Sequence, residues 1–533
     1  MAFNQKLFKK FLTVIPLTIF PIVIASSCSI NNKADQPSDD SQEKPNDPAN
    51  KSTFGNWDNQ TLDLASADFW NRPDVIAATQ TTNEFNIWKE LALQNQSAQL
   101  TMQTEIRFMD VGQADATLIK VLPKAGLKDR DYQANSFNIL IDSGNFKVEK
   151  TTDQKIYSPF YQTKLKPTLE QELVNDKIDL FMFSHAHADH IGQASQVIKD
   201  FAKPNRSIVI NWGDIDQNSS GFRNLIKTTI NKSLIYLDPF VENAIDVARI
   251  VDDPNFNDPK KNDIFSQFFD QTNQQAQAYG KLSDPNDLKS WQPNPNKLFK
   301  MLPSQNIINF APDNFFAYLA PQTDYEPNQP NHSENENSIN ALFKLANQTQ
   351  DYRIIFTGDA EGHTHQDMLN AINQNQRFQD QDPDHKLSVD LYKVAHHGST
   401  TEQSNNLEFL KAITKANTQF VIQTNDHKLF SNSPTLKTKF FENLQAAALA
   451  KNLELNQSVL ITQNLGDIVY QFDNQQDLKA PKILTFNRQE QINSKHIILK
   501  PNEQMTIDLA SLYKPADQPD RYEKLIYQAK DSY

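Results

Sequence analysis

Cysteine is nearly absent from the sequence, since Cys28 is the single one among 533 residues. That excludes an intramolecular disulfide and any zinc site built from several thiolates. Glycine is also scarce, at 12 residues, whereas Asn, Gln and Asp are abundant, so long polar loops or insertions are expected. No apolar run after residue 28 reaches the length of a membrane span, which argues against a polytopic channel. The formal net charge of −13 argues against coating of nucleic acid by bulk electrostatics, but not against an enzyme that meets it at one cleft.

The N-terminus carries the pattern of an export signal. Three lysines precede an apolar run over residues 11–24, and small residues at 25–27 precede Cys28. The run is too short for a comfortable membrane span. Residues 1–28 resemble a bacterial lipoprotein signal peptide, in which Cys28 is lipidated and becomes the mature N-terminus. An uncleaved signal anchor is the alternative, and both place the bulk of the chain at the extracellular face of the membrane. Residues 29–56, rich in Asn, Asp, Pro, Ser and Lys, are predicted to be a disordered tether.

The densest group of candidate metal ligands follows a predicted buried strand. The strand covers the apolar run at residues 178–183, and Ser184 ends it. Four side chains that bind metals come within the next six residues: His185, His187, Asp189 and His190. Imidazole and carboxylate ligands suit zinc and other borderline divalent ions. A polar loop that is rich in His by chance is the alternative, and this spacing disfavours it.

Other predicted strands also stop at candidate ligands. An apolar run at residues 352–356 leads to Asp359, and another at residues 391–395 leads directly to His396 and His397. Ligand sites gather at the carboxyl ends of neighbouring strands in an α/β layer, so these side chains are expected to meet the first cluster. Further carboxylates follow strand-like runs, where capping of a turn is the alternative role: Asp110, Asp115 and Asp142.

Composition and periodicity divide the rest of the chain. Residues 57–100 have a partly helical pattern and are predicted to be an N-terminal helical extension without chemistry. Residues 101–473 carry the strand and helix pattern of the main domain. Within them, residues 215–306 lose the βα rhythm and are interpreted as a polar insertion, a partly helical lid or specificity element. Residues 474–533 are a C-terminal extension.

Residues 185–190 match the His-x-His-x-Asp-His signature of the metallo-β-lactamase fold superfamily. The chain further resembles the extracytoplasmic hydrolase domain of ComEC-type DNA-uptake proteins, over about residues 100–473, as a free-standing lipoprotein without the channel. The segments that carry this likeness are Asp110-Val-Gly-Gln-Ala-Asp115, Asp142-Ser-Gly144, Thr357-Gly-Asp359 and Ala395-His-His-Gly-Ser399. The resemblance implies an α/β fold, a four-layer αββα sandwich with a polar insertion and a C-terminal extension.

Two positions depart from the family pattern. Ala114 stands in place of the second Gly of Asp-Val-Gly-Gln-Gly-Asp. Asn432-Ser-Pro434 stands where Gly-His-Pro is usual, with His427 nearby as a candidate substitute.

The resemblance also implies two divalent metal ions, zinc or alternatively manganese, and a role for each residue. His185 and His187 would hold one ion, Asp189 and His190 the other, and Asp359 would lie between both. One of His396 and His397 would complete the second site, and the other would steady a developing oxyanion. Asp189 would also orient the attacking water. The first site lacks a third His, so its remaining ligand would be Asp214, Asn337 or water. The candidates for orienting the imidazoles through hydrogen bonds are Asp110, Asp115 and Asp142.

The implied function is that of a metal-dependent phosphodiesterase, foremost a surface-anchored nuclease acting on extracellular DNA or RNA. Nucleic acid and a membrane, through the lipid anchor, are then the expected partners. Two alternatives stay open: a hydrolase of small phosphodiesters, such as phosphocholine groups or cyclic nucleotides, and a non-enzymatic surface-binding lipoprotein. Five other histidines are expected at the surface: His332, His363, His365, His385 and His496. Of these, His363 and His365 follow Asp359 closely and are the candidates for a different role.

Overall fold

The computed structural model describes most of residues 62–486, with gaps, and three short strands beyond them. The described ranges, some with short internal gaps, are 62–76, 85–123, 135–144, 161–211, 220–237, 268–299, 306–319, 334–424, 436–486, 497–499, 505–507 and 527–529. All of them belong to one compact unit, residues 49–533. Among these residues, no helix combines the length and apolarity needed to cross a membrane. Several predictions lie outside the described residues: the signal peptide with Cys28, the tether, Asp214, His332, His427, residues 432–434 and His496.

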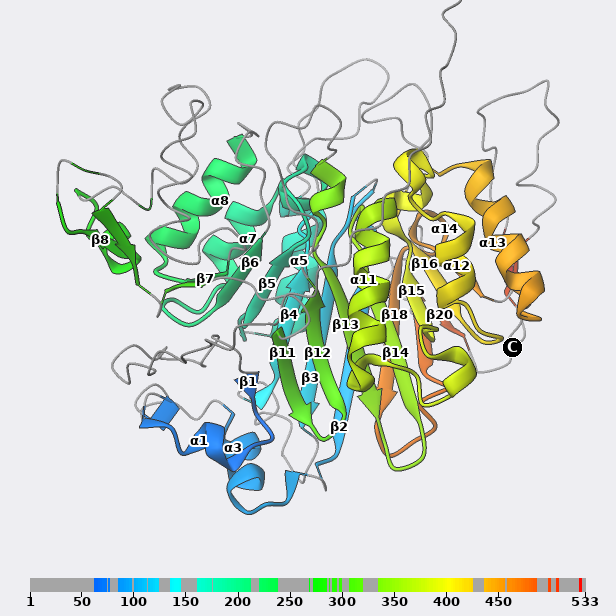
Figure 1. Ribbon diagram of the computed structural model, residues 1–533, viewed down its shortest axis with the longest axis horizontal. Coiled ribbons are helices and arrows are strands. Elements are labelled where there is room, and N and C mark those ends of the chain that lie inside the picture. The colour runs from blue at the N-terminus through cyan, green and yellow to red at the C-terminus, as the bar shows by residue number, and fades with distance from the viewer. Residues whose placement is uncertain are drawn as a thin grey trace, which may run out of the picture. The chain divides into compact units, whose positions relative to one another are not determined.

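Two large sheets form the centre of the described chain (Figure 1). The eight-stranded sheet has the order β1 (Leu62–Asp63), β11 (Asn306–Ala311), β12 (Asn314–Leu319), β13 (Asn340–Ala346), β14 (Asp351–Phe356), β15 (Leu391–Lys393), β16 (Gln419–Ile422) and β17 (Val459–Ile461). The ten-stranded sheet has the order β10 (Leu298–Phe299), β7 (Ile235–Leu237), β6 (Ile208–Asn211), β5 (Leu180–Phe183), β4 (Phe137–Ile141), β3 (Thr117–Pro123), β2 (Met102–Phe108), β18 (Asp467–Asp473), β19 (Lys482–Phe486) and β20 (Ile497–Leu499). Both sheets mix parallel and antiparallel pairs.

The strands are buried on both faces, and successive side chains enter different cores. In β5, Leu180 and Met182 join the core between the sheets, whereas Phe181 and Phe183 join the core under the outer helices. In β14, Ile354 enters the inner core and its neighbour Ile355 the outer one. This follows from the two-residue period of a strand, and it explains why these segments are continuous apolar runs.

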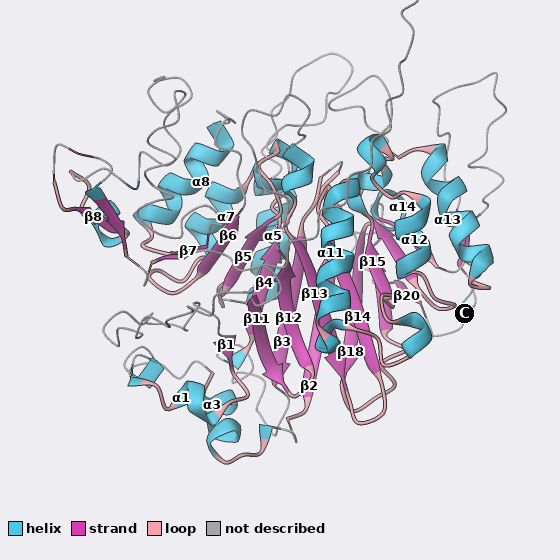
Figure 2. Cartoon of the chain, in the orientation of Figure 1, coloured by secondary structure: helices cyan, strands magenta, loops and turns pink. Residues whose placement is uncertain are grey.

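Helices cover the outer face of each sheet, as the colouring of Figure 2 makes visible. On the ten-stranded sheet, the helices are α5 (Lys166–Leu173), α7 (Ala194–Phe201) and α8 (Ser220–Asn231). On the eight-stranded sheet, they are α11 (Gly362–Gln374), α12 (Leu407–Ile413) and α13 (Thr438–Ala450). One shared inner core and two outer cores make four layers. The predicted αββα sandwich is confirmed.

The helical pattern predicted before residue 100 yields α1 (Ala67–Trp70) and α3 (Asn86–Leu93), preceded by β1. Phe85 and Trp88 reach the inner core, and the indole of Trp88 donates to Asn135 O. These residues close one end of the space between the sheets.

Residues 215–306 continue the sheet in part. The helix α8 is followed by β7, which pairs in parallel with β6, and β10 pairs with β7. The βα rhythm therefore extends past residue 215, where the sequence predicts that it stops. A separate hairpin of β8 (Gly280–Leu282) and β9 (Trp291–Pro293) follows. Within residues 474–533, β19 and β20 extend the ten-stranded sheet beyond β18, and β21 (Met505–Ile507) pairs with β22 (Tyr527–Ala529).

Candidate metal centre

The ten-stranded sheet supplies four candidate ligands from the end of β5. The chain leaves the sheet at Ser184, bends at His185 and Ala186, and enters the short helix α6 (Ala188–Ile191) after His187. The bend presents His185 and His187 to the same position, where their ring centroids lie 4.7 Å apart. The turn of α6 then brings Asp189 and His190 to a second position.

The eight-stranded sheet supplies the remaining candidates from two parallel neighbours. The strand β14 ends at Phe356, three residues before Asp359, and β15 ends three residues before His396. His396 and His397 both have left-handed backbone, with φ of 48° and 52°. Backbone strain of this kind in residues other than Gly concentrates at functional sites.

One cluster consists of His185, His187 and Asp359, whose candidate ligand atoms all lie within 4.8 Å of one another. His185 Nε2 lies 3.0 Å from His187 Nδ1 and 3.9 Å from Asp359 Oδ2. Two imidazole nitrogens on one tetrahedral zinc ion stand about 3.3 Å apart, given bonds of about 2.0–2.1 Å. The pair therefore has the spacing of two ligands that share an ion.

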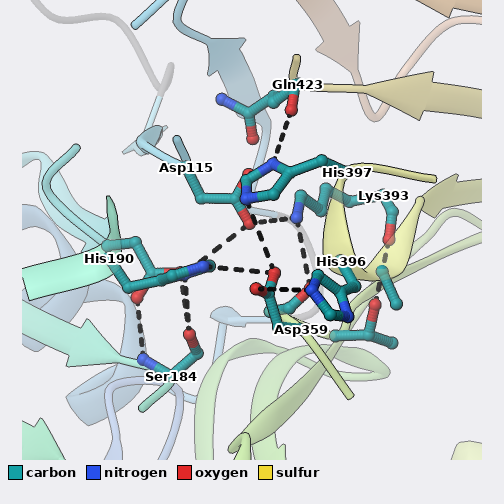
Figure 3. Close-up of polar contacts among 12 residues, drawn as sticks. Asp115, Ser184, His190, Asp359, Lys393, His396, His397 and Gln423 are labelled. Atoms are coloured by element: carbon teal, nitrogen blue, oxygen red, sulfur yellow. Dashed lines mark hydrogen bonds and ion pairs between the residues drawn. The ribbon is translucent and has the colours of Figure 1, made fainter. Parts of the chain in front are cut away.

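A second cluster consists of Asp189, His190, Asp359 and His397. His190 Nε2 lies 3.1 Å from Asp359 Oδ1, and His397 Nε2 lies 3.7 Å from the same oxygen and 3.5 Å from Asp189 Oδ2. Asp359 thus belongs to both clusters, with Oδ1 toward the second and Oδ2 toward the first. Figure 3 shows the imidazoles of His190 and His397 converging on this carboxylate.

These residues fit a pair of divalent ions. His190 Nε2, His397 Nε2 and Asp359 Oδ1 are buried, and none of them makes a hydrogen bond within the described part of the chain. Buried polar atoms are rarely left so, because losing water without a partner costs free energy. The orphaned atoms face one another and are nitrogen and carboxylate oxygen, the donor types that zinc takes. Bound ions would satisfy them.

Hydrogen bonds from surrounding groups fix the imidazoles. His190 Nδ1 donates to Asp142 Oδ2 at 2.8 Å, and Asp142 also accepts from Ser184 N at 2.7 Å and from Ser184 Oγ at 2.9 Å. His397 Nδ1 donates to Gln423 O at 2.7 Å. In both rings Nε2 is then left as the metal-binding nitrogen, an arrangement that metal-bound His requires. Asp142 contacts an imidazole, as the resemblance implies.

The other two carboxylates predicted to support the imidazoles have different surroundings. Asp115 Oδ1 lies 3.5 Å from His397 Nδ1, and Asp115 Oδ2 lies 3.8 Å from His190 Nδ1. Asp110 Oδ2 instead lies 3.5 Å from Lys164 Nζ, and its backbone N–H donates to Asp467 Oδ1 at 2.8 Å. Asp115 is therefore part of the site, whereas Asp110 holds neighbouring segments together.

Electrostatics couples these groups strongly. Burial raises the pKa of Asp359, but the imidazoles of His190 and His396 outweigh burial and hold that pKa well below its usual value. Burial lowers the pKa of His190, but Asp359 and Asp142 outweigh burial and raise it well above the usual value. For His185, burial lowers the pKa well below the ordinary value. A divalent cation would replace the protons that the carboxylates otherwise hold on neighbouring imidazoles.

His396 stands apart from the second cluster. Its Nε2 lies 3.8 Å from Asp359 Oδ2, on the side of the first cluster, and its Nδ1 lies 3.4 Å from Thr401 Oγ1. Glu361 Oε1 lies 3.9 Å from the same Nδ1. The side chain of His396 is 19% exposed, against 1% for His397. The geometry thus assigns His397 to the second cluster and leaves His396 outside both clusters, partly exposed and near Asp359 Oδ2. Asn337, a candidate third ligand of the first site, is buried in the turn Glu334–Asn337.

Sequence reasoning missed Ser184, Lys393 and Gln423. Ser184 Oγ contacts the Nδ1 atoms of His185 and His190, at 3.1 and 3.2 Å. Lys393 contacts Asp115, and the Gln423 side chain donates to Met109 O and Ala116 O while its carbonyl orients His397. Their signal was a polar residue at the end of an otherwise apolar strand. Such a signal is too common to single them out.

One histidine was placed wrongly. His365 was expected at the surface, but it is buried, and its ring stacks on Phe409 at a centroid distance of 3.8 Å and an angle of 7°. The reason is the packing of α12 against α11, which covers this face. His363 is exposed and His385 half-buried, as expected for surface residues.

No protein-family profile matches the chain, and no curated protein matches it. Among solved structures, the chain is similar to the metallo-β-lactamase fold protein YhfI from Bacillus subtilis, with 11% sequence identity and a TM-score of 0.30, over 70% of this chain and 100% of that one. The chain's own architecture is a four-layer αββα sandwich, with His and Asp clusters suited to divalent metal ions at the ends of its strands.

Proposed function

We propose that the protein is a metal-dependent phosphodiesterase with two divalent ions, zinc or manganese. The observation that carries the proposal is the sharing of Asp359 by two clusters of buried ligands. Two ions held a few ångströms apart by one carboxylate are typical of enzymes that hydrolyse phosphate esters, where both the attacking and the leaving oxygen need stabilisation.

The bound ions would supply Lewis acidity and a lowered pKa for water. The chain's own residues do the rest. Asp189, whose side chain is 15% exposed where that of Asp359 is 3% exposed, is the carboxylate that a water in the site can reach. It can orient that water and accept its proton. His396, partly exposed and with Nε2 3.8 Å from Asp359 Oδ2, can donate to a phosphoryl oxygen as negative charge develops.

We propose nucleic acid as the substrate. The support is the likeness of the segments around Asp110–Asp115, Asp142–Gly144, Asp359 and His396–Ser399 to those of DNA-uptake hydrolase domains. The test is the activity of the full, metal-loaded chain in detergent against single-stranded DNA, double-stranded DNA, RNA and a small chromogenic phosphodiester. Cleavage of the polymers at rates well above that of the small ester is expected. Cleavage of the small ester alone would favour a hydrolase of small phosphodiesters, and no cleavage by metal-loaded protein would refute the enzymatic proposal.

We also propose a lipid anchor at Cys28, which places the enzyme at the extracellular face of the membrane. The support is the order of Lys6, Lys9 and Lys10, the apolar run and the small residues before Cys28. In a bacterial host, Cys28→Ser should abolish incorporation of labelled lipid and leave the precursor unprocessed. Labelling and processing at the wild-type level would exclude the anchor.

A further inference from the structure

A buried lysine lies among the groups that surround the second cluster. Lys393 is the last residue of β15 and is 3% exposed. Its Nζ donates to Asp115 Oδ2 and, at 3.3 Å, to the carbonyl oxygen of Gly358. Figure 3 shows its ammonium group beside the carboxylate of Asp115.

The partners of Lys393 lead to every ligand of the second cluster. Gly358 directly precedes Asp359. The backbone N–H of Asp115 donates to Asp189 O at 3.2 Å, and the carboxylate of Asp115 lies 3.5 Å from His397 and 3.8 Å from His190. In the described part of the chain, neither Lys393 nor Asp115 forms a hydrogen bond or ion pair with His185 or His187.

Stability alone does not account for this ion pair. Desolvating two charges costs about as much as their attraction returns, and a buried pair is often replaceable by apolar side chains. The pair does, however, hold the Asp115 carboxylate on the Lys393 ammonium group. Without the ammonium group, the nearest cations or donors for Asp115 are the imidazoles of His190 and His397. Either ring would then turn away from Asp142 or Gln423, which hold Nε2 in its metal-binding direction.

We propose that Lys393 is a positioning residue for the second metal site, acting through Asp115 and Gly358, with a smaller effect on the first site, which shares Asp359. The proposal rests on the two-metal function proposed above. It differs from a purely structural role, because loss of Lys393 changes the number of ions bound and not only the stability of the fold.

The test uses Lys393→Met, which keeps the length and volume of the side chain and removes its charge. Metal content and chelator competition are measured on the full chain with zinc, and the absorption spectrum with cobalt in its place. We expect two ions per wild-type chain and one per variant, with the affinity for the second ion lowered roughly 10–100-fold, as for other outer partners of metal ligands. The spectrum of the first site should persist, and Lys393→Arg should restore part of the second.

A matched control is available in another buried ion pair. Lys203 Nζ lies 2.6 Å from Asp179 Oδ1, and both residues are 7% exposed. The pair joins the loops that lead into β5 and β6, whereas the clusters lie after the end of β5. Lys203→Met should lower the melting temperature and leave both ions bound.

The outcomes separate the two proposals. Wild-type protein that binds no metal refutes the proposed function, whereas Lys393→Met protein that binds two ions as tightly as wild type overturns the role of Lys393. If Lys203→Met protein also loses an ion, general instability explains the loss in Lys393→Met, and the proposed role of Lys393 is overturned. If Lys393→Met does not fold, Asp115→Asn, which keeps volume and an acceptor for Lys393, must show the same selective loss.

Discussion

The carboxylate of Asp189 is the most open acidic group of the metal centre, and it lies 3.5 Å from His397 Nε2. Asn at this position keeps the size and loses the charge. We expect Asp189→Asn to fold with a melting temperature near that of wild type in excess metal. Its phosphodiesterase rate should fall by at least ~10²–10³-fold, the effect of removing one strong electrostatic contributor. Steady-state rates on DNA and on a chromogenic ester measure it.

The control for Asp189→Asn is His385→Ala. His385 pairs with Asp382 at 2.9 Å in a surface turn, outside the metal centre. Its rate should stay within a few-fold of wild type. Wild-type turnover by Asp189→Asn on every ester would remove the catalytic assignment and leave the fold intact.

His365 makes the fold sensitive to acid. Burial lowers its pKa to about 3, and neither ring nitrogen makes a hydrogen bond within the described residues. In the unfolded chain the His365 imidazole has its ordinary pKa of about 6.5 and binds a proton that it does not bind in the folded chain. The free energy of unfolding therefore falls as pH drops from about 6.5 to about 3. At pH 5 this amounts to about 2 kcal/mol, at about 1.4 kcal/mol per pKa unit.

We therefore expect His365→Phe, which keeps the stack on Phe409, to unfold at higher denaturant concentration than wild type. The gain should grow as pH is lowered from 7 to 4. Denaturation is measured in the presence of a chelator, so that release of metal does not contribute. A gain that does not change with pH would show that His365 does not titrate in this way.

At the scale of elements, the segments after β5 and β14 approach each other closely at Gly358. Gly358 has a φ of +50°, and a Cβ added there would lie 2.5 Å from Ser184 Cβ and 2.6 Å from Ser184 Oγ. Ser184 in turn contacts His185, His190 and Asp142. Gly358→Ala should therefore displace Ser184 and weaken metal binding in addition to straining the backbone.

Gly144→Ala is the matched control for Gly358→Ala. Gly144 has a φ of +72°, but its added Cβ would meet Val111 at an ordinary 3.5 Å. It should lose only the left-handed strain, about 1–2 kcal/mol of unfolding free energy, with metal affinity unchanged. Denaturant titration and chelator competition measure the two effects. Equal metal affinities in both variants would contradict the proposed link through Ser184.

The elements that could be predicted from sequence are those with a local pattern. The strand predicted at residues 178–183 contains β5, and the strand predicted at residues 352–356 coincides with β14 within one residue, because runs of apolar side chains mark both. The short β7 was missed, because three apolar residues after a polar helix are a weak signal.

The same limit applies to the site. Its candidate ligands could be named because their residue types and spacing within single segments match metal chemistry. The structure brings six of them together: His185, His187, Asp189, His190, Asp359 and His397. Lys393 and Gln423 could not be found, because Lys393 is separated from Asp115 by 278 residues and Gln423 from Met109 by 314. Only the docking of the two sheets makes these pairs.

At the scale of the whole molecule, metal should act as a cross-link between the sheets. Residues at the end of β5 and residues after β14 and β15 contribute to the same clusters. Saturating zinc or manganese should therefore raise the melting temperature. The free energy of unfolding should grow with the logarithm of free metal, by about 2.7 kcal/mol at 100 times the dissociation constant. Calorimetry of chelated and reloaded protein measures it.

In Asp359→Asn, which alters the carboxylate common to both clusters, this rise should be largely lost, together with at least one ion in metal analysis. Identical melting curves with and without metal in wild-type protein would show that the sheets do not depend on it.

The position of β18 has a consequence for the order in which the molecule is assembled. This strand inserts between β2 and β19, and Asp467 at its start holds Arg107 and the backbone of Asp110, 360 and 357 residues earlier. Contacts this distant along the chain form late, after most of it has been synthesised. The segment that carries Asp110 and Asp115 can thus settle only once residue 473 is available. A chain exported in unfolded form would complete its metal centre after translocation, so the ion that it carries would be chosen by the medium in which folding ends rather than by the compartment of synthesis.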